Sequence, residues 1–238
     1  MTDLLSYELN DSIATITLDD GKVNVLSPRM LSDINGALDR AEADDAIVVL
    51  AGRAGVFSAG FDLKILRAGG DEALAMLRAG FELAARVLSF PKPVVIACGG
   101  HAIAMGVFLL LSGDYRVGAG GPYKITANEV AIGLTMPRTA VEICRQRLVP
   151  AHFNRATVIA EVYDPDTAVA AGFLDRVVGA AELASTARDV AGQLRALDLD
   201  SHTATKLRAR NTALAAIRMA IDLDYGDAAP SGSARGRL

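Results

Sequence analysis

Residues that build metal sites and disulfide frameworks are scarce in this sequence. Its 238 residues include no tryptophan, two cysteines and three histidines. Cys98 and Cys144 have neither metal-like nor disulfide-framework spacing, which suits a reducing compartment. None of the histidines has a Cys, Asp or Glu at metal-ligand spacing; they are His101, His152 and His202. We therefore expect a protein without a metal site.

Membrane-spanning runs and basic faces are also missing. The longest apolar stretch is interrupted by glycines and is too short to cross a bilayer. The N-terminal residues, MTDLLSYELNDS, carry acids in place of the basic and apolar regions of a signal peptide. The net charge is −4, and Lys and Arg are scattered along the chain. These features predict a cytoplasmic protein that binds neither nucleic acid nor a membrane.

Several widespread catalytic motifs are absent as well. The sequence has no GxSxG segment, no P-loop and no GxGxxG between a strand and a helix. These absences exclude the serine nucleophile of α/β-hydrolases, a P-loop nucleotide site and a Rossmann dinucleotide site.

Apolar periodicity predicts a mixed α/β chain. Segments that alternate apolar and polar residues, or are short and wholly apolar, predict strands, and helical spacing predicts helices. Strands are expected at 6–10, 13–18, 46–51, 94–97, 114–117, 123–126 and 173–178. Helices are expected at 30–41, 72–88, 105–111, 137–148, 154–160, 166–171 and from 181 to about 222. Residues 52–57 are expected to form a loop and residues 98–104 a glycine-bearing turn.

The stretch 98–114, CGGHAIAMGVFLLLSGD, combines this turn with an apolar run that ends at Asp114. Small residues in the turn let other backbone or a ligand come close. The first N–H groups of the helix expected at 105–111 point back at the turn, which favours developing negative charge there. A buried helix after a tight turn, with no chemical role, fits the same pattern.

Two small-residue turns, 58–61 and 102–105, each run into a helix, and one acid, Glu129, lies in the mostly apolar segment TANEVAIGL. Such a set suits an enolate, because a thioester oxygen that gains charge needs two converging donors and a carboxylate can move the α-proton. Asp62 is more simply a helix N-cap, and Glu129 fits a surface acid on a loop equally well. Spacing alone leaves these alternatives open.

Five segments together resemble the crotonase superfamily, the enoyl-CoA hydratase/isomerase family. They occur in the family's order over roughly residues 5–180, and they are GKVNVLS, FSAGFDLK, PKPVVIACGGHAIAMGVFLLLSGDYR, NEVAIGL and DPDTAVAAGFLDRVV. The resemblance implies an α/β spiral of ββα repeats over residues 1–180 and a helical C-terminal region, 181–225, that supports a homotrimer or a dimer of trimers. It also implies coenzyme A thioesters as substrates and no permanently bound cofactor. The composition of residues 226–238 predicts a disordered tail.

Carried over residue by residue, the resemblance implies that the backbone N–H groups of Phe61 and Met105 form an oxyanion hole for the thioester oxygen. It makes Glu129 the catalytic residue. Because the donors are backbone groups, Phe and Met can occupy these positions without removing the function. The resemblance places acyl-CoA-binding residues at Val23, Val25, Ala59, Gly60, Asp62, Leu63, Lys64, Gly106 and Phe108.

One departure from the family pattern bears on the reaction. Family hydratases carry two glutamates, and here the first of these positions is occupied by Phe108 while the second falls on Glu129. Moving a double bond from the 3- to the 2-position needs a single base, and NEVAIG resembles the corresponding stretch of Δ3,Δ2-enoyl-CoA isomerases. An apolar Phe108 excludes water and, if it neighbours Glu129, raises the pKa of that carboxyl by desolvation. We therefore predict an isomerase.

Two alternatives remain. An enoyl-CoA hydratase would need a second acid from elsewhere, such as Asp62 or Glu142. A non-catalytic acyl-CoA-binding protein would keep the oxyanion hole without turnover, and Ala104 and Met105, where family members often have glycine, leave room for it.

Overall fold

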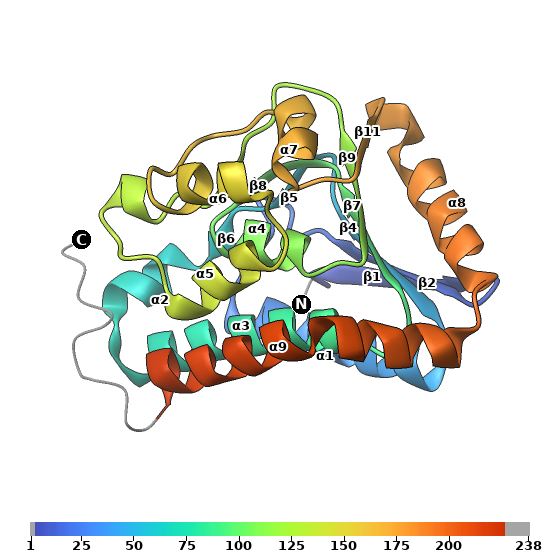
Figure 1. The fold of residues 1–238 in the computed structure, drawn as a ribbon, viewed down its shortest axis with the longest axis horizontal. Coiled ribbons are helices and arrows are strands. Elements are labelled where there is room, and N and C mark those ends of the chain that lie inside the picture. Colours follow the sequence, from blue (N-terminus) through green and yellow to red (C-terminus); the bar gives the residue numbers. More distant parts are fainter. Residues whose placement is uncertain (1–2, 227–238) are drawn as a thin grey trace.

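The computed structural model describes residues 3–226, and these residues form three sheets surrounded by helices (Figure 1). Beyond Gly226, the tail expected to be disordered lies outside the described residues. The strands are β1 (Leu5–Asn10), β2 (Ile13–Leu18), β3 (Val25–Leu26), β4 (Ile47–Gly52), β5 (Gly55–Ser58), β6 (Gly60–Phe61), β7 (Val94–Cys98), β8 (Gly100–Ile103), β9 (Tyr115–Ala119), β10 (Ile125–Thr126) and β11 (Arg176–Val178). The helices are α1 (Pro28–Ala43), α2 (Leu63–Ala68), α3 (Gly70–Ser89), α4 (Met105–Leu111), α5 (Arg138–Arg145), α6 (Pro150–Thr157), α7 (Pro165–Ala171), α8 (Leu183–Arg195) and α9 (Leu199–Tyr225).

The strand order shows that the chain winds as a spiral. The large sheet has the order β1-β2-β4-β7-β9-β11 and the small sheet the order β10-β8-β5. Each turn of the spiral adds one strand to the large sheet (β4, β7, β9) and the next strand to the small sheet (β5, β8, β10). All pairs are parallel except the β1–β2 hairpin, and β3 pairs with β6 in a separate two-stranded sheet. The expected α/β spiral of ββα repeats is therefore confirmed.

Helices cover both faces of the large sheet because side chains alternate between the faces along each strand. One face of β4 directs Val48 and Leu50 into the main core with α1 and α3. The other face directs Ile47 and Val49 toward α8, which packs across β4, β7 and β9. Figure 1 shows α8 standing apart from the other helices on this second face, while α9 runs along α3 and α5.

Most elements of the large sheet and the long helices agree with the sequence expectations. The hairpin turns at Asp11 and Ser12, both with positive φ, and Ser27 caps α1 by accepting a hydrogen bond from the amide of Met30. Pro28 occupies the first turn of that helix.

Two expectations for the small sheet were wrong. Residues 52–57, expected as a loop, contain most of β5, and the expected turn at 98–104 is largely β8. The two strands pair so closely that a Cβ at Gly100 would lie 2.0 Å from the carbonyl carbon of Gly55. The glycines therefore allow two strands to approach closely, whereas the sequence pattern had suggested that they form a turn.

Among residues 3–226, no helix is both long and apolar enough to cross a membrane.

Candidate active site

The two small-residue turns expected to carry backbone donors meet in the structure. Gly60, with φ of +90°, lies at the end of β6, and a Cβ added there would be 3.2 Å from the amide nitrogen of Met105 and 3.0 Å from the carbonyl oxygen of Ile103. A Cβ at Gly106 would lie 2.3 Å from the carbonyl oxygen of Ser58. Only glycine fits at these two positions, so the start of α4 is pressed directly against the turn that precedes Phe61.

Met105 is the first residue of α4, and its amide therefore has no acceptor within the helix. The preceding residue, Ala104, has φ of +50° and ψ of −126°, a conformation usually left to glycine. Alanine thus keeps the turn geometry at a position where family members often have glycine. Phe61 lies in β6, and its ring packs against α3, where a Cβ at Gly80 would lie 2.4 Å from the ring.

The residues expected to contact coenzyme A surround these turns. The amide of Ala59 donates to the carbonyl of Val23 over 3.0 Å, and Val25 pairs with Gly60 between β3 and β6. Val23, Leu63 and Lys64 are exposed, whereas Gly106 and Phe108 are buried in α4. The structure therefore brings the expected set together as an exposed rim beside a buried floor.

Glu129 is buried, with 7% of its surface exposed, although it is an acid near the start of the 3₁₀ turn Val130–Ile132. Its Oε2 atom is buried and has no hydrogen-bond partner among the described residues. Burial raises the pKa of Glu129 to about 7, while a hydrogen bond from its own backbone N–H opposes the shift. The alternative of a surface acid on a loop is therefore wrong, and burial raises the pKa of this carboxyl in the expected direction.

The charge of Glu129 affects the pKa values of two other titratable groups. The carboxylate contributes to the raised pKa values of Cys144, on α5, and Tyr225, at the end of α9. In both residues burial is the larger cause. Among the described residues, no second carboxylate contributes to the shift of Glu129.

An aromatic cluster joins Phe61, which is expected to be an oxyanion donor, to Phe108, which is expected to stand where family hydratases carry a glutamate. Phe108 is 1% exposed, and its ring centroid lies 6.0 Å from that of Phe81. Phe81 also lies 6.0 Å from Phe61, edge to face, and it stacks on Tyr225 at 5.6 Å. Phe108 is therefore surrounded by apolar rings in the core.

A model of the enoyl-CoA hydratase/isomerase family matches residues 8–224 of this sequence. The chain belongs to the enoyl-CoA hydratase/isomerase family. The resemblance drawn from the motifs is confirmed by this match and by solved structures with the same fold.

Named relatives in the family include isomerases, hydratases and a carnitinyl-CoA dehydratase. A solved enoyl-CoA isomerase of Mycobacterium tuberculosis is 51% identical, with 93% of this chain and 97% of that one covered and a TM-score of 0.90. That protein is also described as a probable enoyl-CoA hydratase. Human mitochondrial Δ3,Δ2-enoyl-CoA isomerase is 26% identical, with 92% of this chain and 91% of that one covered and a TM-score of 0.85. A probable enoyl-CoA hydratase of Bacillus subtilis is 29% identical over 119 residues, 48% of this chain and 46% of that protein.

Since these names include isomerases and hydratases, we looked in the structure for a second acid that hydration would need. Asp62 is the N-cap of α2, and its Oδ1 accepts a hydrogen bond from the amide of Lys64 over 2.8 Å. Glu142 lies 3.3 Å from Arg145 on α5. Both acids that sequence reasoning offered as substitutes are therefore engaged locally, and the N-cap reading of Asp62 is confirmed.

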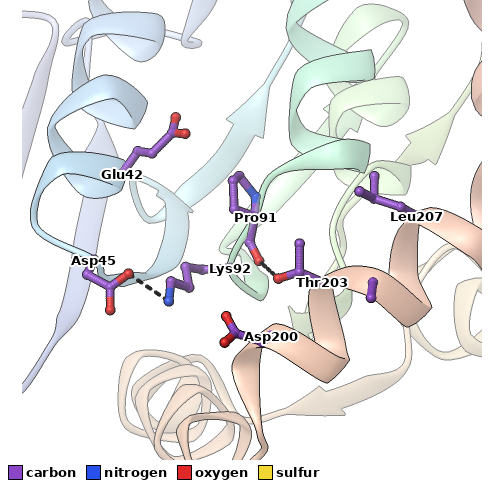
Figure 2. Close-up of a pocket in the computed structure, with 8 residues that line it drawn as sticks. Glu42, Asp45, Pro91, Lys92, Asp200, Thr203 and Leu207 are labelled. Carbon is purple, nitrogen blue, oxygen red and sulfur yellow. Dashed lines mark hydrogen bonds and ion pairs between the residues drawn. The ribbon is translucent and has the colours of Figure 1, made fainter.

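A hollow elsewhere on the surface is poorly suited to an acyl-CoA (Figure 2). It lies between the end of α1, the turn before β7 and the first part of α9, and three carboxylates line it: Glu42, Asp45 and Asp200. The single cation there, Lys92, lies 2.7 Å from Asp45. Such a surface would repel the phosphates of coenzyme A. None of the family's expected site residues lines it.

Sequence reasoning did not place Tyr225 near the site. No local motif marks this residue, because its ring contacts Phe81 only through the packing of α9 along α3 and α5. Within residues 3–226, no group of three or more His, Cys, Asp or Glu side chains could hold a metal ion.

Proposed function

We propose that this chain is a Δ3,Δ2-enoyl-CoA isomerase that shifts the double bond of a 3-enoyl-CoA to the 2-position. Glu129 is its acid and base, and the backbone N–H groups of Phe61 and Met105 form the oxyanion hole. The substrate is an acyl-CoA thioester. Its proposed contacts are Val23, Val25, Ala59, Gly60, Asp62, Leu63, Lys64, Gly106 and Phe108.

The observation that carries the proposal is the isolation of Glu129. It is a buried carboxyl group with an unpartnered oxygen, and its pKa is raised to about 7. A pKa near neutrality suits a group that must first take a proton and then return it. Addition of water is served by two carboxylates, and the position of the family's other glutamate is occupied by buried Phe108.

The proposed reaction needs no co-reactant. The Glu129 carboxylate takes a proton from C2, and the released electron pair spreads through the thioester to form a dienolate. Two N–H donors stabilise the charge on the thioester oxygen. Protonated Glu129 then gives the proton to C4 as the C2–C3 double bond forms. The substrate and the product are isomers, and an apolar Phe108 limits attack by water on the intermediate.

Incubation with 2-enoyl-CoA and 3-enoyl-CoA, followed by mass spectrometry and ultraviolet absorbance, tests the proposal. Wild type should convert the 3-enoyl substrate without a change in mass, and Glu129→Gln should lower kcat by about 10²–10⁴-fold. Glu142→Gln is the matched control, since it makes the same chemical change beside Arg145 on α5 and should retain activity.

The names of several relatives favour hydration as the second candidate. If the protein adds water to crotonyl-CoA efficiently and leaves 3-enoyl-CoA unchanged, its function is hydration and the proposed isomerisation is wrong. Tight acyl-CoA binding without turnover of either substrate, unchanged by Glu129→Gln, would instead identify an acyl-CoA-binding protein.

A further inference from the structure

The last turn of α9 carries an aromatic ring to the proposed site from far along the chain. The Tyr225 ring stacks on Phe81 with centroids 5.6 Å apart and planes inclined by 12°. Phe81 in turn contacts the rings of Phe61 and Phe108. Tyr225 is therefore one ring away from both a proposed oxyanion donor residue and the apolar residue in α4.

A buried ionic anchor holds this turn of α9. Asp224 is 5% exposed and accepts a hydrogen bond from Nη1 of Arg138 over 2.8 Å. It also accepts hydrogen bonds from the backbone amide and the hydroxyl of Thr139, over 3.1 and 3.2 Å. Because Thr139 lies in the first turn of α5, Asp224 caps that helix and ties α9 to the element that carries Cys144. The position of Tyr225 is thus fixed by its neighbour.

The chemistry of the proposed reaction directs the acyl tail toward this region. The thioester oxygen must lie at the Phe61 and Met105 amides, and C2 and C4 must lie at Glu129, so carbons beyond C4 have to pass the groups that surround this acid. Phe81 and Phe108 are packed in the core at 1% exposure each. Tyr225 is less completely buried. Among Phe81, Phe108 and Tyr225, it is therefore the ring with surface left outside the core.

We propose that Tyr225 is a specificity-determining residue that closes the acyl end of the site, so that this protein takes short acyl groups in preference to long ones. The proposal rests on the acyl-CoA site proposed above. Asp224 acts as its positioning residue, because it holds the turn that presents the ring.

Chain-length selectivity measures this role directly. Affinities for saturated six-carbon and twelve-carbon acyl-CoA are determined by calorimetry for wild type, Tyr225→Phe, Tyr225→Leu and Tyr225→Ala. The ratio of twelve-carbon to six-carbon affinity should rise at least about tenfold in Tyr225→Ala, because several methylene groups gain room in an apolar pocket. Tyr225→Leu should shift the ratio in the same direction, and Tyr225→Phe should keep the wild-type ratio.

Two further variants separate selectivity from general damage. Leu223→Ala lies in the same turn at a side chain that is 51% exposed, and it should leave the ratio unchanged. Asp224→Asn should shift the ratio toward the longer chain if the anchor positions the ring. An unchanged ratio in folded Tyr225→Ala or Tyr225→Leu overturns the proposal.

Measuring binding and turnover separately distinguishes a failure of this proposal from a failure of the proposed reaction. Saturated acyl-CoA cannot be isomerised, so its affinity ratio reports on Tyr225 even if 3-enoyl-CoA is not converted. If wild type binds both saturated ligands but isomerises neither the six-carbon nor the twelve-carbon 3-enoyl-CoA, the proposed isomerase activity is wrong. The affinity ratio of the variants then still tests the role of Tyr225. The ratio of kcat/KM for six-carbon and twelve-carbon 3-enoyl-CoA should follow the affinity ratio in an active enzyme.

Discussion

Glu129 combines burial with an ionisable group, and the two conflict near neutral pH. Its Oε2 atom finds no donor among the described residues, so the charged form loses hydration without compensation. The proposed substrate would supply a proton to this carboxylate in each turnover. A destabilised base is therefore the state from which proton abstraction is favoured.

This conflict predicts a stability gain when the charge is removed. The pKa of Glu129 is raised from its ordinary value to about 7, so its stabilising contribution is complete below the ordinary value and is lost as pH rises to about 7. Glu129→Gln should therefore raise the free energy of unfolding above pH 7 by up to about 3 kcal/mol, and by little in mild acid. Urea titrations of wild type and variant, above pH 7 and in mild acid, measure this difference in the free energy of unfolding. A loss of stability at both would contradict the prediction.

The same pKa predicts how activity depends on pH. Since the carboxylate is the form that takes the C2 proton, kcat/KM for isomerisation should rise as pH increases through about 7 and then level off. Steady-state rates on 3-enoyl-CoA across this range test the prediction. A rate that falls over the same interval would mean that the protonated acid is the active form.

The proposed donor at Met105 can be removed without removing the helix start. Proline lacks the N–H but is well tolerated at the first position of a helix. Met105→Pro should lower kcat for isomerisation by about 10²–10³-fold with the circular dichroism spectrum retained. Met105→Leu keeps the amide and serves as the control. Equal activity in both variants would exclude this amide as a donor.

At the scale of elements, the sequence predicted the large sheet and missed most of the small one. Strands β4 and β7 are short apolar runs buried on both faces, which is a strong pattern. Strands β5 and β8 have four residues each and contain glycines, so composition suggested a loop and a turn. Their existence depends on close pairing with distant segments, which local propensity does not encode.

The close pairing of β5 and β8 predicts an intolerance to added atoms. Gly100→Ala would place a Cβ 2.0 Å from backbone and should lower the free energy of unfolding by at least about 3 kcal/mol. Gly36→Ala, at an exposed position in α1 with no atom within 4 Å, should instead raise it by about 0.5–1 kcal/mol. Denaturant titration compares the two variants. A mild effect at Gly100 would show that β5 can move away.

Helix α9 was expected to be helical, but its contacts could not be read from the sequence. It buries two charged residues, Lys206 and Asp224, which a periodic apolar pattern assigns to solvent. Lys206 lies 2.7 Å from Asp114, and Asp224 pairs with Arg138. Because these partners are distant in sequence, the docking of α9, and with it the position of Tyr225, emerges only in the folded chain.

At the scale of the whole molecule, we propose that residues 1–180 form the acyl-CoA-binding core and that residues 181–225 support self-association. The two parts are packed together, since α8 covers the large sheet and Tyr225 at the end of α9 stacks on Phe81. Apolar side chains also stay uncovered on the core itself. Val158, Ile159 and Val162 are 60, 68 and 54% exposed.

These three side chains predict an interface in a homotrimer, or in a dimer of such trimers, because exposed clusters of this kind usually mark association sites. Ile159→Asp should lower the mass of the assembly, measured by light scattering during gel filtration, while retaining the fold. Leu9→Asp, at an exposed position near the end of β1, is the control and should leave the mass unchanged. A wild-type chain that elutes as a monomer would contradict the proposal.

The placement of the two proposed donors on the main chain affects how such a protein can diverge. Nineteen of the twenty amino acids supply the same N–H at positions 61 and 105, so nearly every point mutation there leaves the charge-stabilising device in place. The side chains at these positions are constrained instead by packing, since the Phe61 ring contacts Phe81 and Met105 is 1% exposed. Under the proposed mechanism, substitutions that preserve this packing can therefore accumulate at both positions while the two N–H donors are inherited unchanged.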